Sequence, residues 1–287
     1  MNLPDYLVDA HVHFWNPQRL IYPWLASVPA LNRAFSPDDY AAATKAAKIG
    51  KMIFVECGGE PSQSLDEVKW VSELAACETR LKGIVAHASL ERGAGVRGEL
   101  SALAKSPLVK GVRRNLQGEI DADFCLQPDF IAGVHGLAEF GFSFDLCILH
   151  HQLPAVIELA RRCPEIHFIL DHCGKPAIRD GRLDPWRQHI RELAALPNVA
   201  CKISGLVTEA DPARQGAKDL QPYVKHALDC FGFDRVLFGG DWPVLTLAGD
   251  YSGWLETVVA AVPCASGADL RKLFQTNAEK AYHVQSE

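Results

Sequence analysis

The stretch LVDAHVHF at residues 7–14 is the first of eight short runs that are almost continuously apolar. The other seven runs lie at residues 51–58, 82–89, 109–115, 142–149, 167–174, 199–205 and 235–242. Strands of this kind are typical of parallel sheets that helices cover. Helical patterns follow at residues 64–76, 98–106, 129–141, 153–163, 185–196, 220–232 and 251–262. Eight strand–helix units of about 30 residues each predict an α/β fold, the closed parallel sheet of a (β/α)8 or TIM barrel.

The prediction places residues 1–287 in one domain, because no repeat or linker divides them. An open doubly wound sheet is the competing fold, but no GxGxxG follows the first run. Two irregular connections stand out, at residues 15–36 and 206–219. The first follows the first strand and is rich in Pro and Trp. We therefore expect it at the carboxyl end of the barrel, where long loops are usually functional.

The composition excludes several kinds of partner. Lys and Arg number 29 against 35 Asp and Glu, and no basic run exceeds two residues, which argues against nucleic acid. No apolar run is long enough to span a membrane, and no signal peptide is recognisable. The nine cysteines form no CxxC pair and are read as reduced thiols of a cytoplasmic protein. A small-molecule substrate is expected, and the oligomeric state is left open.

The first strand carries the strongest chemical signal. In a strand, residues two apart face the same side, so His11 and His13 project together. Two adjacent imidazoles are costly to bury unless a metal, an anion or a hydrogen-bond network uses them. Two hydrogen-bonded core histidines are the alternative interpretation.

The end of the eighth run supplies an acid. Asp241 lies in Gly-Gly-Asp-Trp-Pro at residues 239–243. In a closed barrel the eighth strand pairs with the first, so Asp241 should lie beside His11 and His13. A carboxylate next to imidazoles fits a divalent-metal site or a general base. His172, at the end of the sixth run, would add a third imidazole. A turn-forming Asp and a loop His are the alternatives for these two residues.

Other side chains are weaker candidates. Arg113 is preferred to Arg114 for the barrel lumen, because neighbours on a strand face opposite sides. A Cys nucleophile, Cys57 or Cys173, has no supporting signal. The remaining candidates are aromatic walls or histidines near strand ends, namely Trp15, Trp24, His87, His150, His151 and Trp242.

Three motifs in order identify a resemblance that covers nearly the whole chain. D-x-H-x-H at residues 9–13, D-H-x-G at 171–174 and G-x-D-W-P at 239–243 resemble the amidohydrolase-2 branch of the amidohydrolase superfamily. The stretches VDAHVHFWNP, YPWL, KGVRR and DHCGKP are most similar to the sugar-acid lactonases of that branch. The resemblance implies a hydrolase that opens an aldonolactone similar to L-fuconolactone.

The hypothesis for catalysis gives each candidate a role. Asp241 would activate water, while His11, His13, His172 and Arg113 would stabilise the oxyanion. Asp241 or His151 would return the proton to the leaving hydroxyl. Substrate-binding roles are expected for His11, His13, Trp24, His87 and Trp242.

The resemblance leaves the metal open. Members with two metals bridge them with a Lys or Glu at the end of the fourth strand. Lys110 lies near the start of that strand instead, and Arg113 lies further along. A single Zn²⁺ held by His11, His13, His172 and Asp241 is compatible with the sequence, and so is a site that needs no metal.

Two other functions fit the same scaffold. One is a Zn²⁺-dependent decarboxylase or hydratase, which would bind an aromatic or unsaturated acid through Arg113. The YPWL stretch argues against it. The other is a barrel without catalytic activity that binds a metal or a sugar acid.

Overall fold

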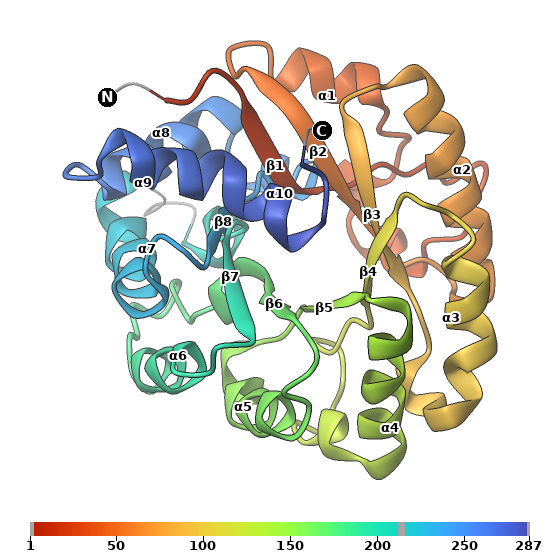
Figure 1. The fold of residues 1–287 in the computed structure, drawn as a ribbon. Helices are drawn as coiled ribbons and strands as arrows, with labels where there is room; N and C mark the ends of the chain where they lie inside the picture. Colours follow the sequence, from red (N-terminus) through yellow and green to blue (C-terminus); the bar gives the residue numbers. More distant parts are fainter. Residues whose placement is uncertain (1–2, 212–215, 286–287) are drawn as a thin grey trace.

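The computed structural model describes residues 3–211 and 216–285. Eight parallel strands follow one another around a barrel in the order β1 to β8, and helices surround them (Figure 1). The strands are β1 (Leu7–Val12), β2 (Ile49–Val55), β3 (Leu81–His87), β4 (Val109–Arg113), β5 (Ser143–Leu146), β6 (Phe168–Leu170), β7 (Val199–Ile203) and β8 (Val236–Phe238). The predicted (β/α)8 barrel is confirmed, whereas the single domain stays a prediction.

The barrel closes between β1 and β8. Val12 pairs with Trp242, the His13 N–H donates to the Trp242 carbonyl at 2.8 Å, and the Asp241 N–H donates to the His11 carbonyl at 2.8 Å. The hydrogen bonds that close the barrel are therefore made by residues of the predicted site.

All seven predicted helical segments contain a helix. The helices are α1 (Pro37–Ala43), α2 (Ser64–Cys77), α3 (Arg97–Leu103), α4 (Pro128–Gly136), α5 (Leu153–Arg162), α6 (Trp186–Ala194), α7 (Ala217–Phe231), α8 (Tyr251–Ala261), α9 (Gly267–Arg271) and α10 (Asn277–Ala281). Helices α1, α9 and α10 were not predicted individually. No helix of the described residues is long and apolar enough to cross a membrane.

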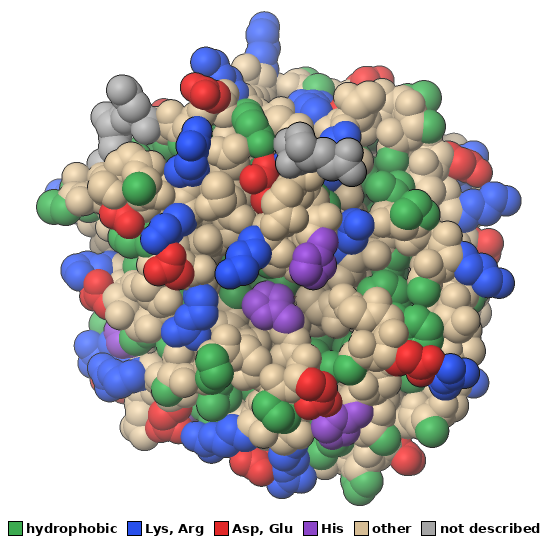
Figure 2. Space-filling view, in the orientation of Figure 1, with side chains coloured by type: hydrophobic (Ala, Val, Ile, Leu, Met, Phe, Trp, Pro, Cys, Tyr) green, Lys and Arg blue, Asp and Glu red, His purple; other side chains and the backbone are tan. Residues whose placement is uncertain are grey.

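The two ends of the barrel differ. Helix α10 lies across the end where the strands begin, since Glu279 accepts from Tyr6 and from Lys51 at 2.6 Å each. Figure 2 shows this face, with Lys and Arg interspersed among Asp and Glu. At the opposite end, the 15–36 connection contains two 3₁₀ turns, Pro23–Ser27 and Pro29–Leu31. In the 206–219 connection, residues 212–215 lie outside the described residues.

Candidate active site

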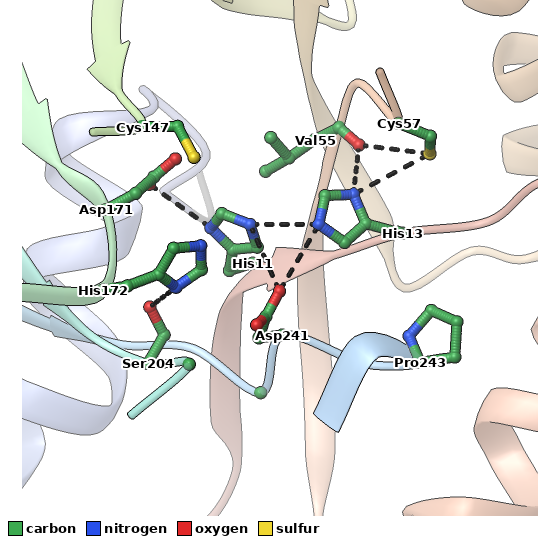
Figure 3. Close-up of polar contacts among 12 residues, drawn as sticks. His11, His13, Val55, Cys57, Cys147, Asp171, His172, Ser204, Asp241 and Pro243 are labelled. Carbon is green, nitrogen blue, oxygen red and sulfur yellow. Dashed lines mark hydrogen bonds and ion pairs between the residues drawn. The ribbon is translucent and has the colours of Figure 1, made fainter. Parts of the chain in front are cut away.

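His11 and His13 lie at the carboxyl end of β1 with their rings together (Figure 3). Their Nε2 atoms are 3.1 Å apart, and both side chains are buried. A register shift between Asp9 and Val12 interrupts the pairing of β1 with β2. Such irregularities re-aim side chains. Ala10 packs inside the barrel, yet His11 also reaches the lumen, where it contacts Lys202.

His172 follows β6 and Asp241 follows β8, and both residues have a left-handed backbone conformation. Both residues have φ of 55°, in the left-handed region that non-glycine residues seldom adopt. Conformations of this kind cluster at functional sites. Here they end two predicted strands, 167–174 and 235–242, earlier than expected.

Gly205 leaves space for the side chains of His172 and Asp241. Its φ is +61°, and a Cβ atom there would lie 2.3 Å from His172 Nδ1 and 3.0 Å from Asp241 Oδ2. His172 Nδ1 is instead 2.9 Å from the Ser204 hydroxyl, which fixes the ring. A side chain at position 205 would therefore displace the imidazole.

Asp241 reaches the histidine pair, as the closed barrel predicts. Its Oδ1 lies 3.5 Å from His13 Nε2 and 3.7 Å from His11 Nε2. Burial alone would raise the pKa of Asp241, but His172, His13 and His11 outweigh it and hold the pKa below its ordinary value. Burial lowers the pKa of His172 to about 4. At neutral pH Asp241 is thus a carboxylate beside a neutral His172 imidazole.

Arg113, the last residue of β4, also reaches the lumen, but acidic groups hold it. Its Nε donates to Glu56 Oε1 at 2.6 Å, and its Nη2 donates to the Glu56 carbonyl at 2.5 Å. Only Nη1 points to the site, 3.3 Å from Asp171 and 3.5 Å from His11. Arg114 lines the cavity as well, contrary to the expectation that one of the two would, because β4 ends before it and strand alternation stops.

A buried charge network beneath His11 was not predicted. Lys202 on β7 has no exposed side-chain surface, and its Nζ lies 2.6 Å from Asp145 and 2.9 Å from Asp171. The same Nζ lies 3.3 Å from His11 Nδ1. Burial would lower the pKa of Lys202, but the two carboxylates raise it, so the ammonium stays charged. A Lys inside the apolar run VACKIS was the signal that could have found it.

The mouth of the barrel holds a cavity of about 500 Å³. This volume suits a ligand of small-molecule size. Its walls combine apolar surface, including two tryptophans, with polar and charged side chains; they include His13, Trp15, Trp24, Glu56, His87, Glu91, Arg113, Arg114, Asn115, Gln117, His172, Lys175 and Asp241. His87 Nε2 is buried without a hydrogen-bond partner among the described residues, so a ligand could satisfy it.

Several candidates lie outside this lining, among them the fully buried His11. His151 is exposed on the 3₁₀ turn His150–Gln152, because β5 ends at Leu146 and the chain then leaves the lumen. Trp242 is buried beneath the 15–36 connection, where its ring packs against Phe35. Burial also raises the pKa of the Cys57 thiol well above its ordinary value, which disfavours it as a nucleophile.

The donor set fits one divalent cation. Ligand atoms of His11, His172 and Asp241 lie within 4.8 Å of one another. His13 Nδ1 is 2.7 Å from the Val55 carbonyl, which only accepts, so His13 Nε2 keeps a free lone pair. A buried acceptor without a hydrogen-bond partner among the described residues, Asp171 Oδ1, lies 3.3 Å from His11 Nδ1 and could orient that ring for a metal. Lys110 is the second residue of β4, away from the mouth, so β4 offers no bridging lysine for a second metal.

A (β/α)8 barrel with a histidine pair on its first strand, a histidine after its sixth and an aspartate after its eighth defines a barrel of the amidohydrolase class. The chain belongs to the amidohydrolase family, whose model Amidohydro_2 matches residues 8–284. This confirms the resemblance seen in the sequence.

Known relatives match most of the chain. It is 31% identical to the L-fucono-1,5-lactonase of Burkholderia ambifaria over 96% of this chain and 95% of that protein. It is 36% identical to the L-fucono-1,5-lactonase of Burkholderia multivorans over 85% and 84% of the two chains. An amidohydrolase of Burkholderia multivorans, solved with bound zinc, matches with a TM-score of 0.87 and 34% identity, over 98% of this chain and all of that one.

Proposed function

We propose that the protein is a lactonase that opens a sugar-acid lactone, an aldonolactone similar to L-fuconolactone, to the free acid. The observation that carries this proposal is the Asp241 carboxylate, which lies against His11 and His13 and lines the cavity at the barrel mouth. The names of the two Burkholderia relatives support the same reaction.

Asp241 is proposed as the general base. Its carboxylate takes a proton from water as the water oxygen attacks the lactone carbonyl carbon. His172 and the Nη1 of Arg113 are the proposed donors to the carbonyl oxygen as it becomes negative, because the Val55 carbonyl holds the His13 proton on Nδ1 and leaves His13 Nε2 an acceptor. A preorganised donor of this kind contributes about 3 kcal/mol to lowering the barrier.

The leaving hydroxyl then needs a proton. A proton donor must lie within hydrogen-bond reach of the leaving atom. His151 is exposed outside the cavity lining, so we assign this step to protonated Asp241. Asp241 thereby returns to its ionised form, and the proton balance closes.

A divalent cation would be held by His11, His13, His172 and Asp241, where it would supply Lewis-acid polarisation of the carbonyl. Zn²⁺ is the proposed ion, because a related amidohydrolase was solved with bound zinc. Whether turnover requires it is tested by comparing the rate before and after chelation. A chelated protein that keeps its full rate would exclude an obligatory metal.

The cavity walls fit a polyhydroxylated ring. His87, Asn115 and Gln117 offer donors and acceptors to ring hydroxyls, and Trp15 and Trp24 offer apolar faces. The Trp24 indole N–H donates to the Cys57 carbonyl at 2.7 Å, which holds that wall in place. We therefore assign substrate-binding roles to Trp24 and His87.

The test is a pH-stat screen of five- and six-membered aldonolactones that differ only in the sugar. Lactone opening releases one proton for each turnover, so base uptake should follow enzyme concentration. A decarboxylase would consume protons and release CO2 from an aromatic or unsaturated acid. Saturable lactone binding without turnover would instead indicate a binding protein. Either result would overturn the proposal.

A further inference from the structure

A chain of hydrogen bonds favours one position for the ring proton of His11. The Val55 carbonyl can only accept, so His13 Nδ1, 2.7 Å away, carries the proton of that ring. His13 Nε2 is then an acceptor, and a proton on the His11 Nε2 that lies 3.1 Å from it can donate to it. With its proton on Nε2, neutral His11 presents a lone pair at Nδ1.

Lys202 supplies the donor that this lone pair needs. Its Nζ lies 3.3 Å from His11 Nδ1 and has only protons to offer. The Nη1 of Arg113 also approaches His11 Nε2, but at 3.5 Å it is the longer contact, and its guanidinium already binds Glu56. The contacts with His13 and Lys202 agree on a proton at Nε2.

A competing acceptor lies beside the same nitrogen. Asp171 Oδ1 is 3.3 Å from His11 Nδ1 and has no hydrogen-bond partner among the described residues. Lys202 Nζ is 2.9 Å from this oxygen, but outside hydrogen-bonding geometry. His11 Nδ1 therefore faces one donor and one acceptor, and each favours a different tautomer.

Lys202 cannot move away from this position without breaking buried contacts. It lies on a strand, has no exposed surface, and pairs with Asp145 at 2.6 Å. The Tyr282 hydroxyl donates to the same Asp145 oxygen at 2.6 Å. Groups on rigid elements, locked by further hydrogen bonds, hold functional geometry best.

We propose that Lys202 is a positioning residue that holds His11 in the tautomer with the proton on Nε2, towards His13, and thereby opposes metal binding at that nitrogen. A cation on Nε2 requires the ring proton to be on Nδ1, where Asp171 Oδ1 accepts it. The ring carries one proton in both states. In the Lys202-bonded state, Nε2–H donates to His13 Nε2, and this nitrogen has no lone pair for a metal.

The direct test is ¹⁵N NMR of the histidine rings in the full-length, chelated protein, with His11 assigned by the loss of its signals in His11→Gln. The wild-type protein should carry the His11 proton on Nε2. The charge-balanced variant Lys202→Met/Asp145→Asn removes an ammonium and a carboxylate together, and its His11 proton should shift to Nδ1. Asp145→Asn alone keeps Lys202 and should keep the wild-type tautomer.

Titration with Zn²⁺ provides a second readout. The double variant should bind Zn²⁺ about tenfold more tightly than the wild type, and Asp171→Asn about tenfold more weakly, the size expected when a partner of a metal ligand is lost. A wild-type proton on Nδ1, or a double variant with unchanged tautomer and affinity, would overturn the inference. Neither readout needs turnover, so a failure of this inference is distinguishable from a failure of the lactonase proposal. If the double variant does not fold, the wild-type spectrum and Asp171→Asn still decide.

Discussion

Replacing Asp241 by Asn removes the proposed base with little change of shape. Asn tolerates the left-handed backbone that position 241 requires, so the turn after β8 should persist. The Oδ1 of the Asp241 carboxylate lies 3.7 Å from His11 Nε2 and 3.5 Å from His13 Nε2. A positioned general base contributes about 10²–10⁴-fold, or about 3–5 kcal/mol of barrier. We expect kcat to fall by that factor.

The assay is the initial rate of acid release from an aldonolactone in a pH-stat. Because the base acts in the transition state, kcat and kcat/KM should fall together while KM changes little. Asp250→Asn is the matched control, since Asp250 caps α8 on the same connection by accepting from the Gly253 N–H. Its rate should equal that of the wild type. An Asp241→Asn protein that stays within about tenfold of the wild-type kcat would refute the assignment.

Three further predictions concern stability and fit. Arg113→Met leaves the buried Glu56 carboxylate unpaired and should lower the free energy of unfolding by about 3–5 kcal/mol in urea denaturation. Burial raises the pKa of Glu67 from 4.5 to about 8, so the folded state favours its protonated form. The stability that Glu67 contributes in this way is complete below pH 4.5 and is lost as pH rises through 8. Unfolding free energies at about pH 5 and about pH 9 should reveal a loss of up to about 5 kcal/mol that Glu67→Gln removes. Gly141→Ala places a methyl group at positive φ in open space and should cost about 1–2 kcal/mol. Gly205→Ala should cost more, because its Cβ also meets His172 and Asp241, and only this variant should abolish turnover.

Much of the fold follows from the sequence because its signals are local. Eight apolar runs and their helical partners predict the barrel, and the two-residue spacing of His11 and His13 predicts their common direction. Closure then brings Asp241 to them across about 230 positions, without any local signal linking the two. The pairing of Val12 with Trp242 is this closure in the structure.

The rest depends on geometry that no short pattern records. The approach of Lys202 to Asp171 and His11 is set by the stagger of different strands. The left-handed turn at His172 ends a segment that reads as continuous strand. The position of His151 depends on where β5 ends. The 3₁₀ turn His150–Gln152 follows, and on it the His151 side chain lies at the surface.

The central claim is that lactone chemistry takes place where His11, His13 and Asp241 meet. A crystal structure of Asp241→Asn with an unhydrolysed aldonolactone tests it most directly. The lactone should bind with its carbonyl carbon about 3–4 Å from the position of the attacking water, beside the side chain of residue 241. The carbonyl oxygen should point towards the histidines. A second cavity of about 470 Å³, lined by His167 and His283, lies at the end where the strands begin. A lactone bound there, with the mouth cavity empty, would contradict the account.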